Sequence, residues 1–490
     1  MRRTLLRIAA TAAVSALTVP LLPGLAQAAP VQGGKGKGTQ VLVVSSGKDD
    51  GSKGTLRWAL QESNSTSAVE RIEITAAAGI IRLTGELPAI TAPVTITGTA
   101  GKRGGHPAAG IDGSGYTDTS TTASCPGWTS GSGPNVRSIT SPGLQVVDSG
   151  GVVIKGLTIR NFCIGILSLR SHDNTFTGNL IQNSIGAAGI EVTGDDGTGG
   201  VATGASVRNT VSDNVFLNNG DAMEFTRGTT DGLISGNTFL TDDTAPAGLV
   251  RSASIEFAGS GNDRNTIIGN RFLGGMSDAL QLFSGADNLV KNNVIRGYAN
   301  AVTAGGTGLR IEGNEISGNH MGVNSTSGTP TITRNSIHDN GADISLCNAG
   351  GICDTNSLYE TAKLGIDLAA RGVTANDALD ADNVQNHPVV TSVTRRADGS
   401  LRVTGVLDSK ASRSYRVELF ANRTTTSYGY GEGDTYAGAA VVTTDSSGHA
   451  TFTITVPRRC FADRQKWLTA TATDLVDGPT SEFSASFPLG

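Results

Sequence analysis

The chain has 490 residues, with 66 glycines, only 5% aromatic residues and a formal net charge of −5. This charge argues against nucleic-acid binding, which requires a basic face. The many glycines and few aromatic residues favour a fold of tight turns over an aromatic-rich binding module.

Residues 1–28 have the pattern of a secretion signal peptide. Arg2, Arg3 and Arg7 precede an apolar run over residues 8–25, and Ala26-Gln27-Ala28 is a small-residue cleavage site. The pattern predicts a secreted, extracellular protein, exported by the general route or, given the paired arginines, by the twin-arginine route. No later segment is long and apolar enough to predict a membrane span.

Residues 29–50 are rich in Gly, Lys and Ser and predict a flexible leader. A helix is predicted over residues 55–64, with Leu56, Ala59 and Leu60 on one face. Short strands are expected next. They are predicted at residues 71–74, 80–83, 94–96 and 111–113, before a Ser/Thr/Gly-rich excursion at 117–140.

A degenerate repeat occupies the middle of the chain. An Asn recurs at one phase of the repeat, and it is followed by an apolar residue one or two positions later. The positions are Asn179, Asn214, Asn237, Asn270, Asn293, Asn314 and Asn335. A unit of about 21–23 residues, twice enlarged, indicates a solenoid. Brief apolar–polar alternation within each unit indicates short strands, and stacked Asn amides could hydrogen-bond from one coil to the next. The prediction is an all-β chain with a right-handed parallel β-helix and an N-terminal cap helix over residues 51–362.

The phrase Asn-Thr-Ile-Ile-Gly-Asn-Arg-Phe at residues 265–272 resembles the repeats of pectate-lyase-like right-handed β-helix proteins. The helix at 55–64 is similar to the Leu-Arg-Glu-Ala helix that opens many secreted bacterial β-helix proteins, with Trp58 in place of the acid. The resemblance implies the fold and a helix that caps the open end of the solenoid. It implies no single activity, because this fold is shared by lyases, hydrolases, epimerases, adhesins and inert shafts.

After the solenoid, residues 363–388 form an Asp/Asn-rich joint. Asp377, Asp380 and Asp382 could bind Ca²⁺, or they could form Asx turns. Strands recurring every 10–15 residues predict a β-sandwich over 389–490. They are expected at residues 389–395, 401–407, 415–420, 439–443, 450–456 and 468–473. This region resembles a module common in secreted bacterial β-helix proteins, a likeness that implies position and no activity.

Five cysteines fit an oxidising compartment. Cys347 and Cys353 bracket a short loop that a disulfide could close. Cys125 and Cys163 could pair if residues 117–140 fold back, which leaves Cys460 as the odd cysteine.

No standard catalytic motif is present. When the coils are aligned by their Asn phase, an acid or amide lies at the centre of four successive strands: Glu191, Glu224, Glu256 and Gln281. Their apolar neighbours predict that these side chains point outward, about 5 Å apart. The repulsion between the carboxylates would then be relieved by a bound cation, by Arg227 or Arg251, or by a raised pKa. The competing interpretation is a solvated outer face.

Two insertions, at residues 193–205 and 242–250, flank this strip and predict a groove. The candidate catalytic residues are Glu224, Glu256, Glu191, Asp221 and Asp278. The candidate substrate-binding residues are Gln281, Arg227, Arg251, Asp195 and Asp196. The central Glu224 is expected to have the highest pKa of the three glutamates and to act as general acid.

The predicted function is that of a secreted, monomeric β-helix protein whose acidic lateral groove binds an extracellular polysaccharide. The groove could also cleave it, as a hydrolase with paired carboxylates or as a lyase with Ca²⁺. The alternative is a non-catalytic surface or matrix protein, a rigid shaft with a sandwich module for attachment.

Overall fold

The computed structural model describes residues 40–66, 69–99, 101, 105–116, 141–184, 188–195, 202–242, 244–245, 253–275, 277–325, 327–346, 351–369, 372–461 and 464–489. The predicted signal peptide, the excursion at 117–140, Cys125, Cys347, Asp196 and Arg251 lie outside these residues. Predictions about them stay predictions. Among the described residues, no helix combines the length and the apolar character needed to cross a membrane.

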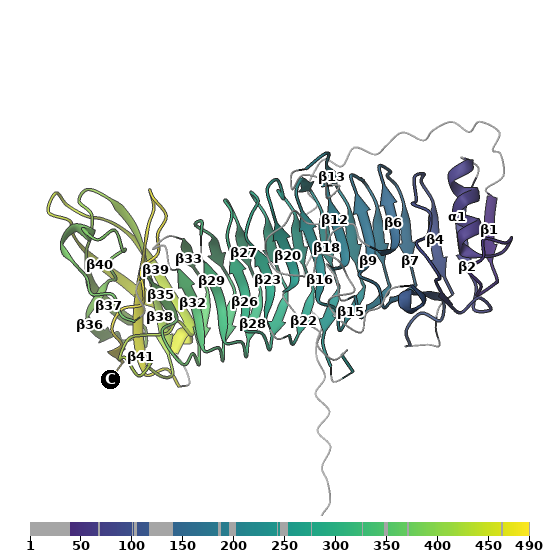
Figure 1. Ribbon diagram of the computed structural model, residues 1–490. Helices are drawn as coiled ribbons and strands as arrows, with labels where there is room; N and C mark the ends of the chain where they lie inside the picture. Colours follow the sequence, from purple (N-terminus) through teal and green to yellow (C-terminus); the bar gives the residue numbers. More distant parts are fainter. Residues whose placement is uncertain are drawn as a thin grey trace, which may run out of the picture. The chain divides into compact units, whose positions relative to one another are not determined.

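The predicted right-handed parallel β-helix is confirmed, as three long parallel sheets in which successive coils stack strand on strand (Figure 1). The first sheet contains β1 (Gln40–Val44), β2 (Val69–Ile74), β4 (Thr95–Gly98), β7 (Val153–Lys155), β10 (Thr175–Thr177), β14 (Thr210–Ser212), β18 (Leu233–Ser235), β21 (Thr266–Ile268), β24 (Leu289–Lys291), β27 (Arg310–Glu312), β30 (Thr331–Thr333) and β33 (Ile352–Asp354).

The second sheet contains β3 (Ile80–Arg82), β5 (Gly110–Asp112), β8 (Thr158–Arg160), β11 (Leu180–Gln182), β15 (Val215–Leu217), β19 (Thr238–Leu240), β22 (Arg271–Leu273), β25 (Val294–Arg296), β28 (Glu315–Ser317), β31 (Ser336–His338) and β34 (Ser357–Tyr359). The third sheet contains β6 (Pro142–Val147), β9 (Ile164–Leu169), β12 (Ala188–Thr193), β16 (Asp221–Thr226), β20 (Ala253–Ala258), β23 (Asp278–Leu282), β26 (Asn300–Ala304), β29 (Met321–Ser325), β32 (Ala342–Leu346) and β35 (Ile366–Leu368). A further short pair joins β13 (Ser206–Val207) to β17 (Thr229–Thr230).

Each coil folds in this way because its short strands place one apolar side chain inward and polar side chains outward. Inward residues of successive coils pair in register, as Ile234 does with Ile267. In the second sheet, Phe216, Phe239 and Phe272 stack with ring centroids 4.9 and 4.6 Å apart. The solenoid core is therefore a set of continuous apolar rows.

The predicted asparagine ladder is also present. From Asn179 to Asn335, the Nδ2 group of each ladder Asn donates a hydrogen bond of 2.9–3.0 Å to the Oδ1 atom of the next. The ladder continues to Asn356. Each Oδ1 also accepts a backbone N–H, as between Asn214 and Asn237. The ladder satisfies buried polar groups at the turn in every coil.

The N-terminal end is covered by α1 (Leu56–Ser65), where Thr55 accepts a hydrogen bond from the Trp58 N–H group. Leu56, Ala59 and Leu60 are buried. The predicted leader over 29–50 is corrected at its end, because Gln40–Val44 form β1 and pair with β2. The apolar–polar alternation of this segment lets it extend the sheet.

The C-terminal region contains the predicted antiparallel strands in two sheets that share one apolar core. One sheet is formed by β36 (Val389–Arg395), β37 (Leu401–Asp408) and β40 (His449–Val456). The other is formed by β38 (Ser414–Asn422), β39 (Thr435–Thr443), β41 (Trp467–Asp474) and β42 (Phe487–Pro488). Because β35 pairs with β32, the solenoid runs beyond the predicted boundary at residue 362.

Three buried glutamates of the C-terminal region accept backbone N–H groups of the last coil. The pairs are Glu418 with Thr355 at 3.0 Å, Glu432 with Thr361 at 2.9 Å, and Glu482 with Leu368 at 2.9 Å. The last coil has no following coil to accept these N–H groups. The carboxylates replace it, one for each side of the solenoid.

The predicted Cys347–Cys353 disulfide is wrong, because Cys353 is a free cysteine. Cys353 pairs in register with the inward residue Ile332, so its thiol lies in the core, where burial raises its pKa to about 12. Cys460 is also free. Cys163 is disulfide-bonded, and its predicted partner Cys125 lies outside the described residues.

The acids of the joint form the turns that the sequence offered as the alternative to Ca²⁺. Asp377 accepts the N–H groups of Ala381 and Asp382. Asp380 accepts from Asn386 and Ser409, and Asp382 accepts from Val384. Their oxygens therefore cap local N–H and O–H groups, and the three acids do not form a metal-binding group in the structure. The proposed Ca²⁺ site of the joint stays a prediction.

Candidate functional site

A single outward row of the third sheet contains the predicted strip. Glu191 pairs in register with Glu224, Glu224 with Glu256, and Glu256 with Gln281, as predicted. The full row is Gln145, Leu167, Glu191, Glu224, Glu256, Gln281, Thr303, Asn324, Ser345 and Asp367. Polar residues thus fill the row except at Leu167, and glutamates occupy three successive coils.

The row points away from the core, because residues on either side of each glutamate, such as Met223 and Phe225, are fully buried inside the coil. Glu191 is nevertheless 0% exposed and Glu224 only 5% exposed. Glu256 is partly exposed. A solvated outer face therefore does not describe Glu191 or Glu224.

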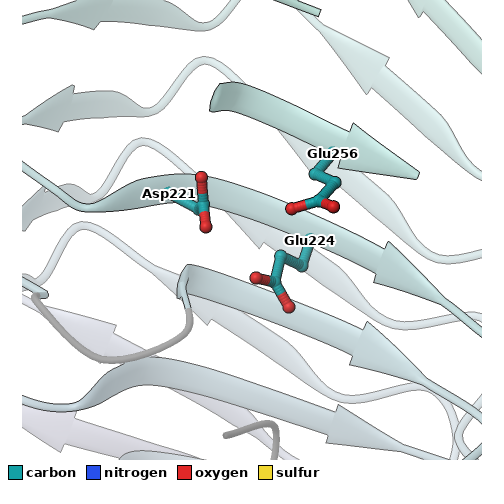
Figure 2. Close-up of side chains that lie close together, drawn as sticks. All are labelled: Asp221, Glu224 and Glu256. Atoms are coloured by element: carbon teal, nitrogen blue, oxygen red, sulfur yellow. The ribbon is translucent and has the colours of Figure 1, made fainter. Parts of the chain in front are cut away.

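Asp221, at the start of β16, places a further carboxyl group beside the glutamates of the row. One carboxylate oxygen each from Asp221, Glu224 and Glu256 lie within 4.8 Å of one another, and Figure 2 shows the three carboxyl groups converging over neighbouring strands. Oxygens so arranged are potential ligands of a metal ion. Asp278 does not join this group. Its two oxygens accept hydrogen bonds from Asn300 Nδ2 and Thr303 Oγ1, both at 2.6 Å.

Among the described residues, few donors reach the carboxyl groups of Glu191 and Asp221. Glu191 Oε1 accepts the Thr226 hydroxyl at 2.8 Å, and Asp221 Oδ1 accepts the Ala253 N–H at 2.6 Å. The other oxygens, Glu191 Oε2 and Asp221 Oδ2, are buried, and no donor among the described residues forms a hydrogen bond with them. Sequence reasoning missed Thr226, although its position two residues after Glu224 places it on the same outward face.

Burial raises the pKa of Glu191 well above its usual value, and the nearby Glu224 carboxyl adds to this while the Thr226 hydrogen bond opposes it. Burial likewise raises the pKa of Asp221, followed by the charges of Glu224 and Glu256. Position in the row predicted the highest pKa at the central Glu224. In the structure, burial is the largest cause of the raised pKa of both Glu191 and Asp221, and the expectation for Glu224 stays a prediction. Two carboxylates about 5 Å apart repel by about 3 kcal/mol at an effective dielectric constant of 20.

The nearest predicted cation, Arg227, follows β16 directly. Its Nη1 atom forms an ion pair of 2.9 Å with Asp195 Oδ2, in which the Arg227 side chain is 15% exposed and that of Asp195 is fully buried. In the described part of the chain, no ion pair reaches Glu191, Asp221 or Glu224. Arg227 and Asp195 therefore meet beside the strip, just after the C-terminal ends of β16 and β12, while Asp196 and Arg251 lie outside the described residues.

A small cavity of about 30 Å³ lies beside the start of these strands. Its lining includes Ala253, Asp278 and Tyr298. The Tyr298 hydroxyl and Ser254 are hydrogen-bonded at 3.0 Å, and burial raises the Tyr298 pKa to about 12. No pattern in the sequence singled out Tyr298, which follows β25 in a bend. The predicted groove depends on insertions whose central residues lie outside the described part, so it stays a prediction.

Comparison with known proteins gives matches at three levels. A family model described as periplasmic copper-binding protein (NosD) matches residues 129–297. Among solved structures, the Dettilon tailspike protein has a TM-score of 0.38 and 12% identity, over 90% of each chain. The A-module of a mannuronan C-5 epimerase from Azotobacter vinelandii has a TM-score of 0.38 and 14% identity, over 64% of this chain and 74% of that one.

A protein of Acinetobacter baylyi named 3-dehydroshikimate dehydratase is 33% identical over 439 residues, which cover 84% of this chain and 88% of that protein. This similarity spans most of both chains, so it includes the β-helix and is not confined to a short repeat motif. The chain belongs to the family of this Acinetobacter baylyi protein.

Proposed function

We propose that the chain catalyses the elimination of water from a small polyhydroxylated keto acid of the 3-dehydroshikimate type, at the carboxylates of the Glu191–Glu256 row. The relative that supports this proposal shares 33% identity over most of both chains. We place the reaction at this site because Asp221, Glu224 and Glu256 converge on one outward face.

The chemistry of such an elimination suits a group of carboxylates. A proton on the carbon next to a ketone is acidic, and a carboxylate base can remove it. The hydroxyl on the following carbon then leaves with a proton from an acid, as water. In 3-dehydroshikimate, loss of one water and a shift of a ring proton to oxygen give an aromatic dihydroxybenzoate, so atoms and charge balance without an oxidant.

We assign a role to each residue of the site from the exposure and position of its side chain. Glu256 is partly exposed and is the carboxylate that a substrate can reach, so we assign it the role of base. Glu224 lies one coil away in register and is assigned the role of proton donor to the leaving hydroxyl. Arg227, directly after the same strand, pairs with Asp195 through Nη1, and its remaining N–H groups are the donors that we assign to the carboxylate of the substrate.

The test is an assay of the purified chain with 3-dehydroshikimate, followed by the absorbance of the aromatic product. Glu256→Gln and Glu224→Gln should each lower turnover by about 10²-fold or more, the usual contribution of a general acid or base. Glu73→Gln is the matched control, because Glu73 pairs with Arg71 on the first sheet, away from the row. No product from the unaltered chain would contradict the proposal.

A second candidate is the binding and cleavage of an extracellular polysaccharide along the same face. One observation favours it. The polar row continues over successive coils from Glu191 to Asp367, each coil adding about 4.8 Å, which suits an elongated ligand. The acids, however, lie close together at one place in the row, which favours a small substrate. A glycan panel assayed with and without Ca²⁺, for new reducing ends and for unsaturated products, separates the two candidates.

Copper binding, named for the matching family model, has less support from the site. Copper prefers nitrogen and sulfur ligands, whereas the metal-binding group found among the described residues contains carboxylates alone. Export by the segment over residues 1–28 remains part of the proposal, and it is tested by the N-terminal sequence of the mature protein.

A further inference from the structure

The register of the third sheet brings together the three carboxylates shown in Figure 2. Glu224 and Glu256 are direct register partners on adjacent coils. Asp221 begins the strand that contains Glu224, and its Oδ1 atom is anchored by the N–H group of Ala253 on the next coil. The Asp221 carboxyl is therefore fixed beside the other two by the backbone, before any ligand is present.

The second observation is a shortage of donors at buried oxygens. Asp221 Oδ2 is buried and receives no hydrogen bond from the part of the chain that the structure describes, and the same is true of Glu191 Oε2 on the coil below. Both side chains are fully buried and lie close to the Glu224 carboxyl. Buried carboxylate oxygens that face other carboxylates need a positive partner, because they have lost their water.

No side chain of the described residues supplies that partner to Asp221. The guanidinium group of Arg227 is engaged with Asp195 at 2.9 Å. The donors that do reach the buried acids are one hydroxyl and one backbone N–H, from Thr226 and Ala253. These donors are neutral, and among the described residues no cationic side chain forms an ion pair with Asp221 or Glu191, so a proton or a bound cation must balance the two buried carboxyl groups.

We propose that Asp221, Glu224 and Glu256 bind a divalent, oxygen-seeking cation, for which Ca²⁺ is the best fit. Carboxylate oxygens are hard ligands, which select Ca²⁺, Mg²⁺ or Mn²⁺ over copper or zinc. Ca²⁺ binds oxygens at about 2.3–2.6 Å in flexible geometry, whereas Mg²⁺ requires a near-ideal octahedron at about 2.0–2.1 Å. Three oxygens that all lie within 4.8 Å of one another are compatible with the more permissive geometry of Ca²⁺.

Three carboxylates leave several positions of the cation open, since Ca²⁺ takes about six to eight oxygens. Water fills these positions in the resting protein. Because Glu256 is partly exposed, the open positions face the side from which a hydroxyl or keto oxygen of a substrate could approach. The cation site itself does not depend on the proposed dehydration, and it can be tested by binding alone. A bound cation would hold Glu224 and Glu256 as ionised carboxylates, so the proton-transfer roles proposed above belong to the cation-free chain.

The test is isothermal titration of the full chain with CaCl₂ near pH 7, after treatment with EDTA and removal of the chelator. One saturable site per chain is expected, together with a rise in melting temperature on addition of Ca²⁺. Asp221→Asn should weaken binding by about tenfold or more, since it removes a charged ligand. Glu256→Gln should do the same, and its partial exposure makes it the variant less prone to misfold.

Asp278→Asn is the matched control. Asp278 is an equally buried acid on the same sheet, but both its oxygens are satisfied by Asn300 and Thr303, so Ca²⁺ affinity should stay within about twofold. The proposal is overturned if the unaltered chain shows no saturable binding. It is also overturned if Glu256→Gln binds Ca²⁺ as the unaltered chain does.

The outcomes also separate this inference from the proposed function. Turnover of 3-dehydroshikimate by the EDTA-treated chain, without Ca²⁺ binding, would overturn the cation site and leave the dehydration intact. Ca²⁺ binding that depends on Asp221 and Glu256, without any turnover, would support the cation site and contradict the dehydration.

Discussion

Thr226 donates its hydroxyl hydrogen to Glu191 Oε1 at 2.8 Å, across the boundary between two coils. The contact shows how the row differs from an ordinary surface. Thr226 and Glu224 lie on the same outward face of β16, and Glu191 lies under both, so a glutamate that points out of the core is still sealed from water. Charge is thereby concentrated where solvent cannot screen it.

The central glutamate allows a test that separates catalysis from stability. Glu224→Gln should abolish turnover while the far-ultraviolet circular dichroism stays that of the unaltered chain. In buffer with chelator, the melting temperature should be equal or slightly higher. The free energy of unfolding should rise by at most about 1 kcal/mol, because one of several like charges is removed. Glu191→Gln should impair turnover less, since Gln keeps an oxygen for Thr226. Full activity in Glu224→Gln would show that the site is elsewhere.

The asparagine ladder should carry a large share of the stability of the coils. The Asn237 side chain accepts the backbone N–H and the amide of Asn214, and it donates to Val211 and Asn270. Asn237→Ala leaves these buried groups unpaired and should cost about 3 kcal/mol or more in the free energy of unfolding, measured by urea denaturation. Asn324→Ala, on the partly exposed outward row, is the control and should cost less than about 1 kcal/mol.

The register of the acidic row could be predicted from the sequence, because the Asn phase fixes where each coil restarts. Once Asn179 and Asn214 are aligned, Glu191 and Glu224 follow at nearly equal offsets, and the structure pairs them. The cap helix and the sandwich strands were predictable for similar reasons, since both have clear periodicity.

Burial and pairing were not predictable in the same way, because they depend on side chains from other coils. Glu191 is sealed by neighbours that no repeat pattern identifies. Arg227 was expected to relieve the glutamates, but the path of the following segment brings Asp195 to it instead. The error over Cys353 has the same origin: the short spacing to Cys347 suggested a loop, whereas the register of the first sheet places Cys353 in the core.

The carboxylates that accept N–H groups of the last coil should stabilise the chain only in their ionised form, which accepts hydrogen bonds and donates none. Glu482 accepts the N–H groups of Leu368 and Thr374 with different oxygens, at 2.9 and 2.8 Å. Glu482→Gln would turn an NH₂ group toward one of these donors, and should cost about 1–3 kcal/mol in urea denaturation. The control is Glu62→Gln, on the exposed face of α1, which should leave stability unchanged. Equal stability of both variants would show that the last coil does not need these acceptors.

His338 should make stability depend on pH above neutrality. Burial lowers the pKa of His338, but hydrogen bonds to Asp339 and Glu315, at 2.7 and 2.9 Å, outweigh burial and raise the pKa above 6.5. The folded chain therefore holds this proton more tightly than the unfolded chain does. The resulting stabilisation is complete below the unfolded pKa, near 6.5, and is lost as pH rises through the folded pKa. Melting temperatures measured from pH 6 to 9 should fall in the unaltered chain and fall less in His338→Asn. His106→Asn, at an exposed site, should keep the original slope, and an unchanged slope in His338→Asn would assign the effect to another group.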